Sequence, residues 1–279
     1  VPEAVLDIDT SRKHCAHVSD LEIYNAVAIG PGLGKHEETV NVVRKLMQTW
    51  DGPMIIDADG LNIIAEHPEL LTYLHERCLL TPHVKEFERL VGKCANDFVR
   101  LNKLVIFLLQ YKVYLILKGA YSVVATPEGK IFFNMSGNPG MAKGGSGDVL
   151  TGILLALAAN GLNLLDVARI GAFVHGLAAD ILVEEYGFRG ITSGMLAQEL
   201  GHAWKRIEKK IMEKNKEEAL LKSRIASPYT DTSYRYKKKS IAFLYLLVIA
   251  LVALVIFWSV KQVTVGKMVT TTASQIEGR

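Results

Sequence analysis

Apolar residues along positions 1 to about 208 fall into short runs and longer segments. The short runs lack polar alternation, which is typical of strands that a parallel sheet buries on both faces. The longer segments are amphipathic or wholly apolar and have the length of helices. The predicted strands are 23–29, 53–57, 78–81, 113–117, 122–126 and 130–133, and the predicted helices are 36–49, 68–76, 84–91, 95–110, 147–160, 164–186 and 193–207. This order predicts an α/β fold with three layers, in which a mainly parallel sheet carries helices on both faces.

The last two predicted strands form an exception to the parallel pattern. Pro127, Glu128 and Gly129 connect these two strands. Such a short turn joins antiparallel strands. We therefore expect a hairpin at one side of the parallel sheet.

The composition changes after residue 208. Residues 208–224 are rich in Lys and Glu and predict a solvated helix, and 227–236 are a polar linker. Residues 240–260 carry no charge and are long enough to cross a bilayer as a helix, although a buried core helix is the alternative. The predicted organisation is an α/β domain at 1–208, a charged helix and basic linker at 209–239, a C-terminal transmembrane-like helix at 240–260 and a short polar tail at 261–279.

Charge and cysteine content narrow the class of protein. Lys237, Lys238 and Lys239 precede the apolar segment, so the positive-inside rule predicts a cytoplasmic α/β domain with membrane anchoring through 240–260. The formal net charge of +3 gives no case for nucleic-acid binding. The three cysteines lack CxxC spacing, which suggests neither disulfides nor a zinc site.

The segment 138–152, NPGMAKGGSGDVLTG, carries the clearest chemistry. Its glycines let the backbone approach a ligand closely, and the helix that follows offers free N–H groups and a positive dipole end. These features predict an anion site, formed by Gly144, Gly145, Ser146 and Gly147, for a phosphoryl group in transfer. Asp148 stands in the first helical turn, where it could take a proton from an attacking hydroxyl. Alternatively, Asp148 is only a helix cap and the glycines only a flexible loop.

Four other polar segments follow predicted strands. They are GPGLG at 30–34, DADGLN at 57–62, TPH at 81–83 and LKGAYS at 117–122. Ligands bind at the carboxyl ends of strands in open α/β sheets, so these segments are expected to share one site. Lys118 offers a compact charge suited to phosphate, with a solvent-exposed lysine as the alternative.

Together these five ordered segments resemble the ADP/ATP-dependent NAD(P)H-hydrate dehydratases, a carbohydrate-kinase-related branch of the ribokinase-like superfamily. The resemblance implies that Asp148 is the catalytic base and that the glycine-rich loop is the anion hole. It also implies that ADP or ATP contacts Lys118, Gly119, Ala120, Tyr121, Ser122 and Gly147. The residues implied in binding the substrate are Gly32, Gly34, Asp59, Asn62, His83 and Asp148.

The resemblance further implies the reaction, in which the S epimer of hydrated NADH or NADPH is phosphorylated on its hydroxyl and then loses phosphate. Magnesium is expected on the nucleotide phosphates, and the sequence indicates no protein ligands for a metal. A homo-oligomer is also expected. Two alternatives remain open, namely a small-molecule kinase of the same superfamily acting on a sugar or hydroxymethylpyrimidine, and an inactive membrane-tethered nucleotide-binding protein.

The chain departs from the family pattern at its two ends. A leading section with the first strands and a GSxGMxGA-like turn would precede Val1, so we expect a fragment, a sheet completed by a partner, or an inactive protein. The final residues 276–279 resemble a protease-cleavage sequence. Three origins of the apolar tail therefore stay open: a natural segment, a wrongly joined reading frame or an engineered fusion.

Overall fold

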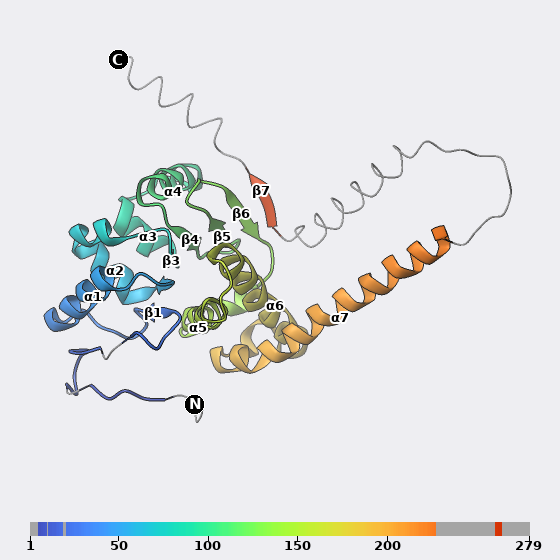
Figure 1. The fold of residues 1–279 in the computed structure, drawn as a ribbon, viewed down its shortest axis with the longest axis horizontal. Coiled ribbons are helices and arrows are strands. Elements are labelled where there is room, and N and C mark those ends of the chain that lie inside the picture. The colour runs from blue at the N-terminus through green and yellow to red at the C-terminus, as the bar shows by residue number, and fades with distance from the viewer. Residues whose placement is uncertain (1–4, 10, 19–20, 227–259, 264–279) are drawn as a thin grey trace, which may run out of the picture.

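A computed structural model describes residues 5–9, 11–18, 21–226 and 260–263. Its centre is a seven-stranded sheet in which the strands are arranged in the order of the sequence (Figure 1). The strands are β1 (Val27–Ile29), β2 (Met54–Ile56), β3 (Cys78–Leu80), β4 (Tyr114–Leu117), β5 (Val123–Ala125), β6 (Ile131–Asn134) and β7 (Val260–Val263).

The sheet is mixed. Strands β1 to β4 pair in parallel, whereas β4–β5, β5–β6 and β6–β7 are antiparallel. The predicted hairpin is confirmed as β5–β6, whose turn includes Gly129 at φ +78° with its N–H donating to the Thr126 carbonyl. The prediction of a mainly parallel sheet was wrong, because short turns after β4 and β5 reverse the chain without a crossover helix and β7 pairs antiparallel with β6.

Helices cover both faces of this sheet, as predicted (Figure 1). They are α1 (Glu37–Thr49), α2 (Ala58–Glu66), the 3-10 helix η1 (Pro68–Tyr73), α3 (Val84–Val91), α4 (Asp97–Tyr111), the 3-10 helix η2 (Pro139–Met141), α5 (Ser146–Ala159), α6 (Leu164–Gly190) and α7 (Ser193–Ala226). Met54 and Ile56 pack toward α1–α4, while Ile55 between them packs toward α5 and α6. This alternation explains why the strand runs are apolar throughout.

Several predicted boundaries were wrong. The strand predicted from residue 23 begins only at Val27, and Ile23 is 80% exposed. The helix predicted at 68–76 is the shorter 3-10 helix η1, and α2 was not predicted as a helix. The predicted end of α6 at residue 186 agrees with a break in the helix, because Gly187 has non-helical angles.

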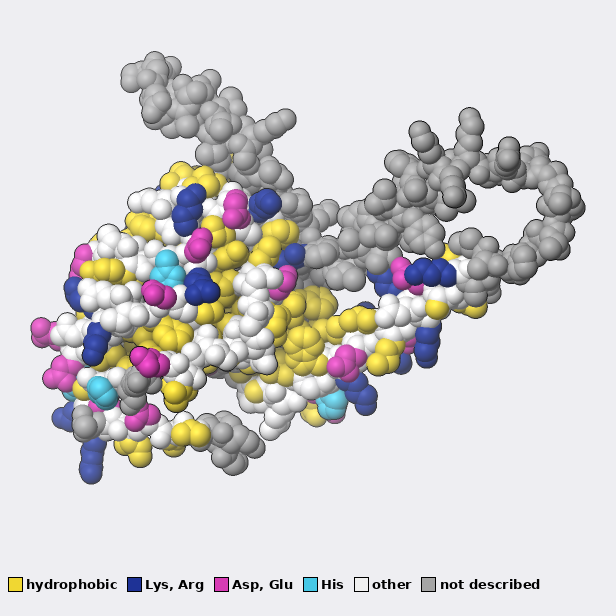
Figure 2. All heavy atoms as spheres, in the orientation of Figure 1, with side chains coloured by type: hydrophobic (Ala, Val, Ile, Leu, Met, Phe, Trp, Pro, Cys, Tyr) yellow, Lys and Arg dark blue, Asp and Glu magenta, His cyan; other side chains and the backbone are white. Residues whose placement is uncertain are grey.

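Helix α7 continues well past the predicted boundary at residue 208. Residues 208–222 of this helix are rich in charge and largely exposed, as predicted for this region (Figure 2). Of the predicted membrane helix, 240–259 lie outside the described residues and Val260 begins β7. Among the helices that the structure describes, none has the length and apolar character needed to cross a membrane.

Candidate functional site

Three of the predicted segments meet at the carboxyl ends of β2, β3 and β4. Asp57 follows β2 and its N–H donates to the Ile29 carbonyl, at the end of β1, at 3.0 Å. The β3–β4 pairing extends beyond the strands, because the Lys118 N–H donates to the Pro82 carbonyl at 2.8 Å and Lys118 forms a bridge with His83. The sheet thus places these polar residues along one edge, as expected for a ligand site in an α/β fold.

A buried carboxylate lies at the centre of this edge. Asp57 is 1% exposed, and its Oδ1 accepts from Lys118 Nζ at 2.5 Å and from the Ala58 N–H at 2.8 Å. Its Oδ2 accepts from Thr151 Oγ1 on α5 at 2.8 Å. Both oxygens are therefore occupied, which offsets the cost of burying the charge. The alternative of a solvent-exposed Lys118 was wrong, since its side chain is only 21% exposed.

Gly147 lies directly against this pair. A Cβ at Gly147 would be 3.4 Å from Lys118 Nζ and 3.6 Å from Asp57 Oδ2. The ammonium group consequently lies close to the N-terminal turn of α5, where the helix dipole is positive. A cation and a helix N-terminus together favour a phosphate.

The glycine-rich loop before α5 is held by neighbouring backbone and side chains. Gly145 is the N-cap residue in the left-handed region at φ +84°, and it provides no side-chain cap. The Ser146 N–H donates to the Lys143 carbonyl at a long 3.5 Å, and the N–H groups of Gly147 and Asp148 are left for another acceptor. Ser193 Oγ donates to the Gly144 carbonyl at 2.6 Å, and Lys143 Nζ donates to the Ile191 carbonyl. Asp148 is exposed in the first turn, where it can meet a bound molecule.

A buried histidine supports the same loop from α6. His175 is 7% exposed and its Nε2 is 3.4 Å from the Ser146 hydroxyl. Burial lowers the pKa of His175 from 6.5 to about 4, and the charge of Lys118 acts in the same direction. The imidazole is therefore neutral at physiological pH.

This lowered pKa predicts acid sensitivity. The folded state takes up the His175 proton only near pH 4, whereas the unfolded chain takes it up near 6.5. The stability linked to this group is complete above pH 6.5, falls as the pH drops toward 4, and amounts to about 3 kcal/mol. Urea unfolding at neutral and acidic pH should show this loss in the unaltered chain and a smaller loss in His175→Gln. An identical pH dependence in both proteins would contradict the prediction.

The predicted substrate-binding residues form a second network beside β2. Asp59 Oδ2 accepts from the Gly34 N–H at 2.9 Å, and Asp59 Oδ1 accepts from Asn62 Nδ2 at 3.2 Å. Arg89 on α3 donates to Asn62 Oδ1 at 2.6 Å. Three of the predicted residues are thus brought together, while Gly32 lies in the same turn with open space around it.

His83 and the loop after Lys118 flank these networks. His83 caps α3, with its Nδ1 accepting from the Glu86 N–H at 3.1 Å and its own N–H donating to Glu86 Oε2 at 2.7 Å. Gly119, Ala120 and Tyr121 form an exposed turn, and Ser122 Oγ donates to the Gly119 carbonyl at 3.4 Å. The structure gives His83 a capping role, and its contact with substrate stays a prediction.

Asp57, Thr151, Arg89 and His175 belong to these networks but were not among the predicted site residues. Asp57 and Thr151 stand inside the quoted segments, and Thr151 follows Gly147 by one helical turn, which places both on the same face. Arg89 stands in the last turn of α3, and His175 stands inside α6. Nothing in their local sequence distinguishes them from surface or core residues.

The chain is similar in sequence to proteins of one family. A sequence model described as NAD(P)H-hydrate dehydratase matches residues 2–206. A bifunctional NAD(P)H-hydrate repair enzyme of Thermofilum pendens is 44% identical over 179 residues, which are 63% of this chain and 34% of the relative. An ADP-dependent (S)-NAD(P)H-hydrate dehydratase of Neisseria meningitidis is 34% identical over 210 residues, 72% of this chain and 67% of the relative. The chain therefore spans about a third of the bifunctional relative.

A solved structure also resembles this fold. The ADP/ATP-dependent NAD(P)H-hydrate dehydratase of Bacillus subtilis, co-crystallised with ATP and Mg²⁺ and soaked with CoA, is 30% identical with a TM-score of 0.58. The similarity covers 68% of this chain and 69% of that one.

Proposed function

Because this chain belongs to the NAD(P)H-hydrate dehydratase family, we propose that it repairs the S epimer of hydrated NADH or NADPH with ADP or ATP as phosphoryl donor. The observation that carries the proposal is the approach of Lys118 to Gly147 in the first turn of α5, the turn that also carries Asp148. A cation, a helix N-terminus and an exposed carboxylate are the groups that phosphoryl transfer to a hydroxyl requires.

The proposed reaction has two steps. Asp148 takes the proton of the substrate hydroxyl, whose oxygen attacks the terminal phosphorus while the bond from phosphorus to the leaving nucleotide breaks. The first-turn amides of α5 and Lys118 stabilise the charge on the transferred group. The carbon–oxygen bond of the phosphate ester then breaks, phosphate leaves with the oxygen, and loss of a ring proton restores the double bond.

The nucleotide and the substrate are assigned to two neighbouring parts of this edge. We assign ADP or ATP to Lys118, the 119–122 turn and Gly147, and the hydrated nicotinamide to the loop of Gly32 and Gly34 with Asp59, Asn62 and His83. The hydrogen bonds that link Gly34, Asp59 and Asn62 support the second assignment, because they hold three of its members in one position. We assign Asp148 to the substrate hydroxyl, from which it takes the proton as the phosphoryl group is transferred.

Magnesium fits this edge as a companion of the nucleotide. When bound, Mg²⁺ neutralises and orients the nucleotide phosphates. The oxygens of Asp57 are occupied by Lys118, Thr151 and Ala58, so we assign Mg²⁺ mainly to the phosphates and to no dedicated set of side chains.

The test is recovery of NADH from hydrated NADH, followed by the near-ultraviolet absorbance of the reduced nicotinamide. The protein is supplied with Mg²⁺ and either ADP or ATP, and the nucleotide that supports the rise is the donor. A stable phosphate ester without recovery would indicate a small-molecule kinase of this superfamily. Nucleotide binding without phosphate release would indicate the tethered binding protein.

We further propose that residues 240–260 are a membrane anchor and that the α/β domain lies in the cytoplasm. The uncharged length of that segment supports the proposal. Ending the chain before Ser240 is expected to release the protein from membranes. Fractionation of cells that express both chain lengths measures this, and equal sedimentation of the two would contradict an anchor.

We also propose self-association through the open side of the sheet. In the described part of the chain β1 pairs only with β2, and an unpaired edge favours pairing with another strand. Light scattering is expected to give a mass of at least two chains. A well-folded monomer across the concentration range would exclude this interface.

A further inference from the structure

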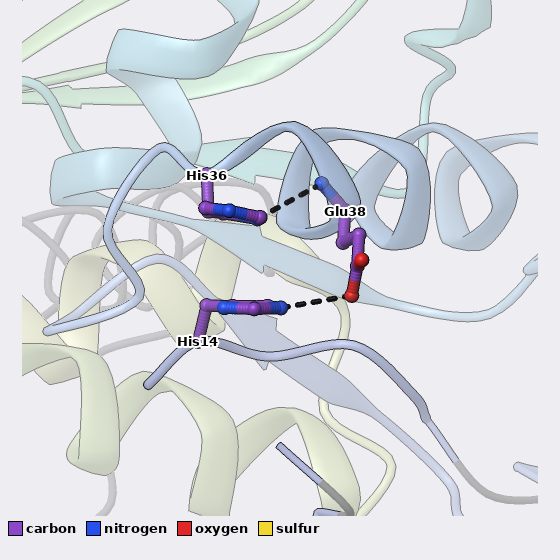
Figure 3. Close-up of side chains that lie close together, drawn as sticks. All are labelled: His14, His36 and Glu38. Atoms are coloured by element: carbon purple, nitrogen blue, oxygen red, sulfur yellow. Dashed lines mark hydrogen bonds and ion pairs between the residues drawn. The ribbon is translucent and has the colours of Figure 1, made fainter. Parts of the chain in front are cut away.

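Three side chains with metal-binding atoms meet at the N-terminal end of α1 (Figure 3). His14 comes from the irregular segment at 11–18, His36 is the N-cap residue of α1, and Glu38 lies in its first turn. Their candidate ligand atoms all lie within 4.8 Å of one another. None of the three is among the residues proposed above for catalysis, nucleotide binding or substrate binding.

The three side chains already face one another. His14 Nε2 lies 2.8 Å from Glu38 Oε2, and a proton must occupy that contact. The two imidazole rings stack with centroids 3.8 Å apart and an angle of 12° between their planes. The His14 side chain is only 17% exposed, whereas Glu38 is 60% exposed, so the cluster is held on one side and open to solvent on the other.

We propose that His14, His36 and Glu38 bind a divalent transition metal of the zinc class. The metal would replace the proton between His14 and Glu38 and take one ring nitrogen of His36. Two imidazoles and one carboxylate are a common ligand set for Zn²⁺ and leave a fourth position for water. Mg²⁺ and Ca²⁺ prefer oxygen ligands only and are therefore excluded from this site.

The surroundings favour the required form of His14. Its Nδ1 lies 3.3 Å from Ser11 Oγ, which can accept the ring N–H and leave the lone pair of Nε2 for the metal. His36 Nδ1 accepts from the Glu38 N–H at a long 3.3 Å, a contact that a metal bond can replace. Cys15 Sγ instead donates to the His17 carbonyl at 3.5 Å, so we assign it no part in this ligand set.

Metal binding would join the 11–18 segment to α1. Besides the cluster, a hydrogen bond from Thr39 Oγ1 to the Cys15 carbonyl at 2.9 Å links the same two parts. A bound metal would add a bond to His14 in the 11–18 segment and bonds to His36 and Glu38 at the start of α1. It should therefore protect the backbone at Arg12 and Lys13 from trypsin.

The test uses the full chain without a histidine tag, titrated with Zn²⁺ by calorimetry and with Co²⁺ by visible absorption. We expect one ion per chain, no thiolate charge-transfer band, and no competition from excess Mg²⁺. His14→Ala and His36→Ala should each weaken Zn²⁺ binding at least tenfold, since each removes a ligand. His17→Ala and His67→Ala are the matched controls and should bind as the unaltered chain does.

The rate of tryptic cleavage gives a second readout, which does not require a measured affinity. Zn²⁺ should slow tryptic cleavage after Arg12 and Lys13 in the unaltered chain and in His17→Ala, but not in His36→Ala. Unchanged Zn²⁺ affinity in His14→Ala and His36→Ala would overturn the proposal. A thiolate band, or cleavage rates that Zn²⁺ leaves unchanged, would overturn it as well.

Discussion

Asp148→Asn is expected to lower the rate of NADH recovery by a factor of about 10²–10⁴, the contribution of a positioned general base. Asparagine has the same shape but cannot accept the hydroxyl proton. The affinity for ADP or ATP should change little, because Lys118 and the first-turn amides of α5 are retained. Steady-state assays and calorimetric titration with the nucleotide separate the two effects.

Asp166→Asn is the matched control for this substitution. Asp166 also stands in the first turn of a helix, α6, and its Oδ2 accepts from Asn163 Nδ2 at 2.7 Å. Asn163 lines a hollow together with Pro53 and Arg77, which precede β2 and β3 at the opposite edge of the sheet. Turnover should therefore be unaffected in Asp166→Asn. Equal losses of turnover and nucleotide affinity in Asp148→Asn would remove the case for a base.

Lys118→Met is expected to lower the free energy of unfolding by about 3–5 kcal/mol, the cost of leaving a buried charge without its partner. Asp57 is 1% exposed and would keep only Thr151 and the Ala58 N–H as partners. Nucleotide affinity should fall too, since the cation beside Gly147 is lost. Urea unfolding and nucleotide titration measure the two losses.

The double variant Asp57→Asn with Lys118→Met distinguishes these effects. Removing both charges should restore most of the stability while the nucleotide affinity stays low. Lys130→Met, an exposed lysine after the β5–β6 turn, is the control and should change neither property. If Lys118→Met unfolds like this control, the Asp57–Lys118 pair does not form in solution.

The sequence predicted the layers of the fold better than its boundaries. Continuous apolar runs marked β2 and β3 correctly, because Met54, Ile55 and Ile56 are buried on both faces. Helix α2 was missed because DADGLN has the composition of a turn. In the structure the same residues begin a helix, with Asp57 as the N-cap and Ala58 at φ +44°.

The candidate site was predictable where polar residues follow strands and where the glycine-rich segment precedes a helix. Lys118 was selected for its charge and its place after a predicted strand, whereas the resemblance to the dehydratases implied Asp59 and Asn62. The partners of these residues come from other elements, and no local pattern reveals them. His175 stands 29 residues after Ser146 on a different helix, so its contact with the glycine-rich loop depends on how α5 and α6 pack.

The order of the strands has a consequence for folding during synthesis. From β1 to β6, each strand pairs with the one that the ribosome has just completed, and α1 to α4 cover one face as they emerge. The other face, with Ile55, Leu79 and Ile116, must wait for α5 and α6, which are translated after all six strands. Nascent chains that end before α5 should therefore carry an exposed apolar sheet face and recruit chaperones, and recruitment should decline once α6 has left the exit tunnel.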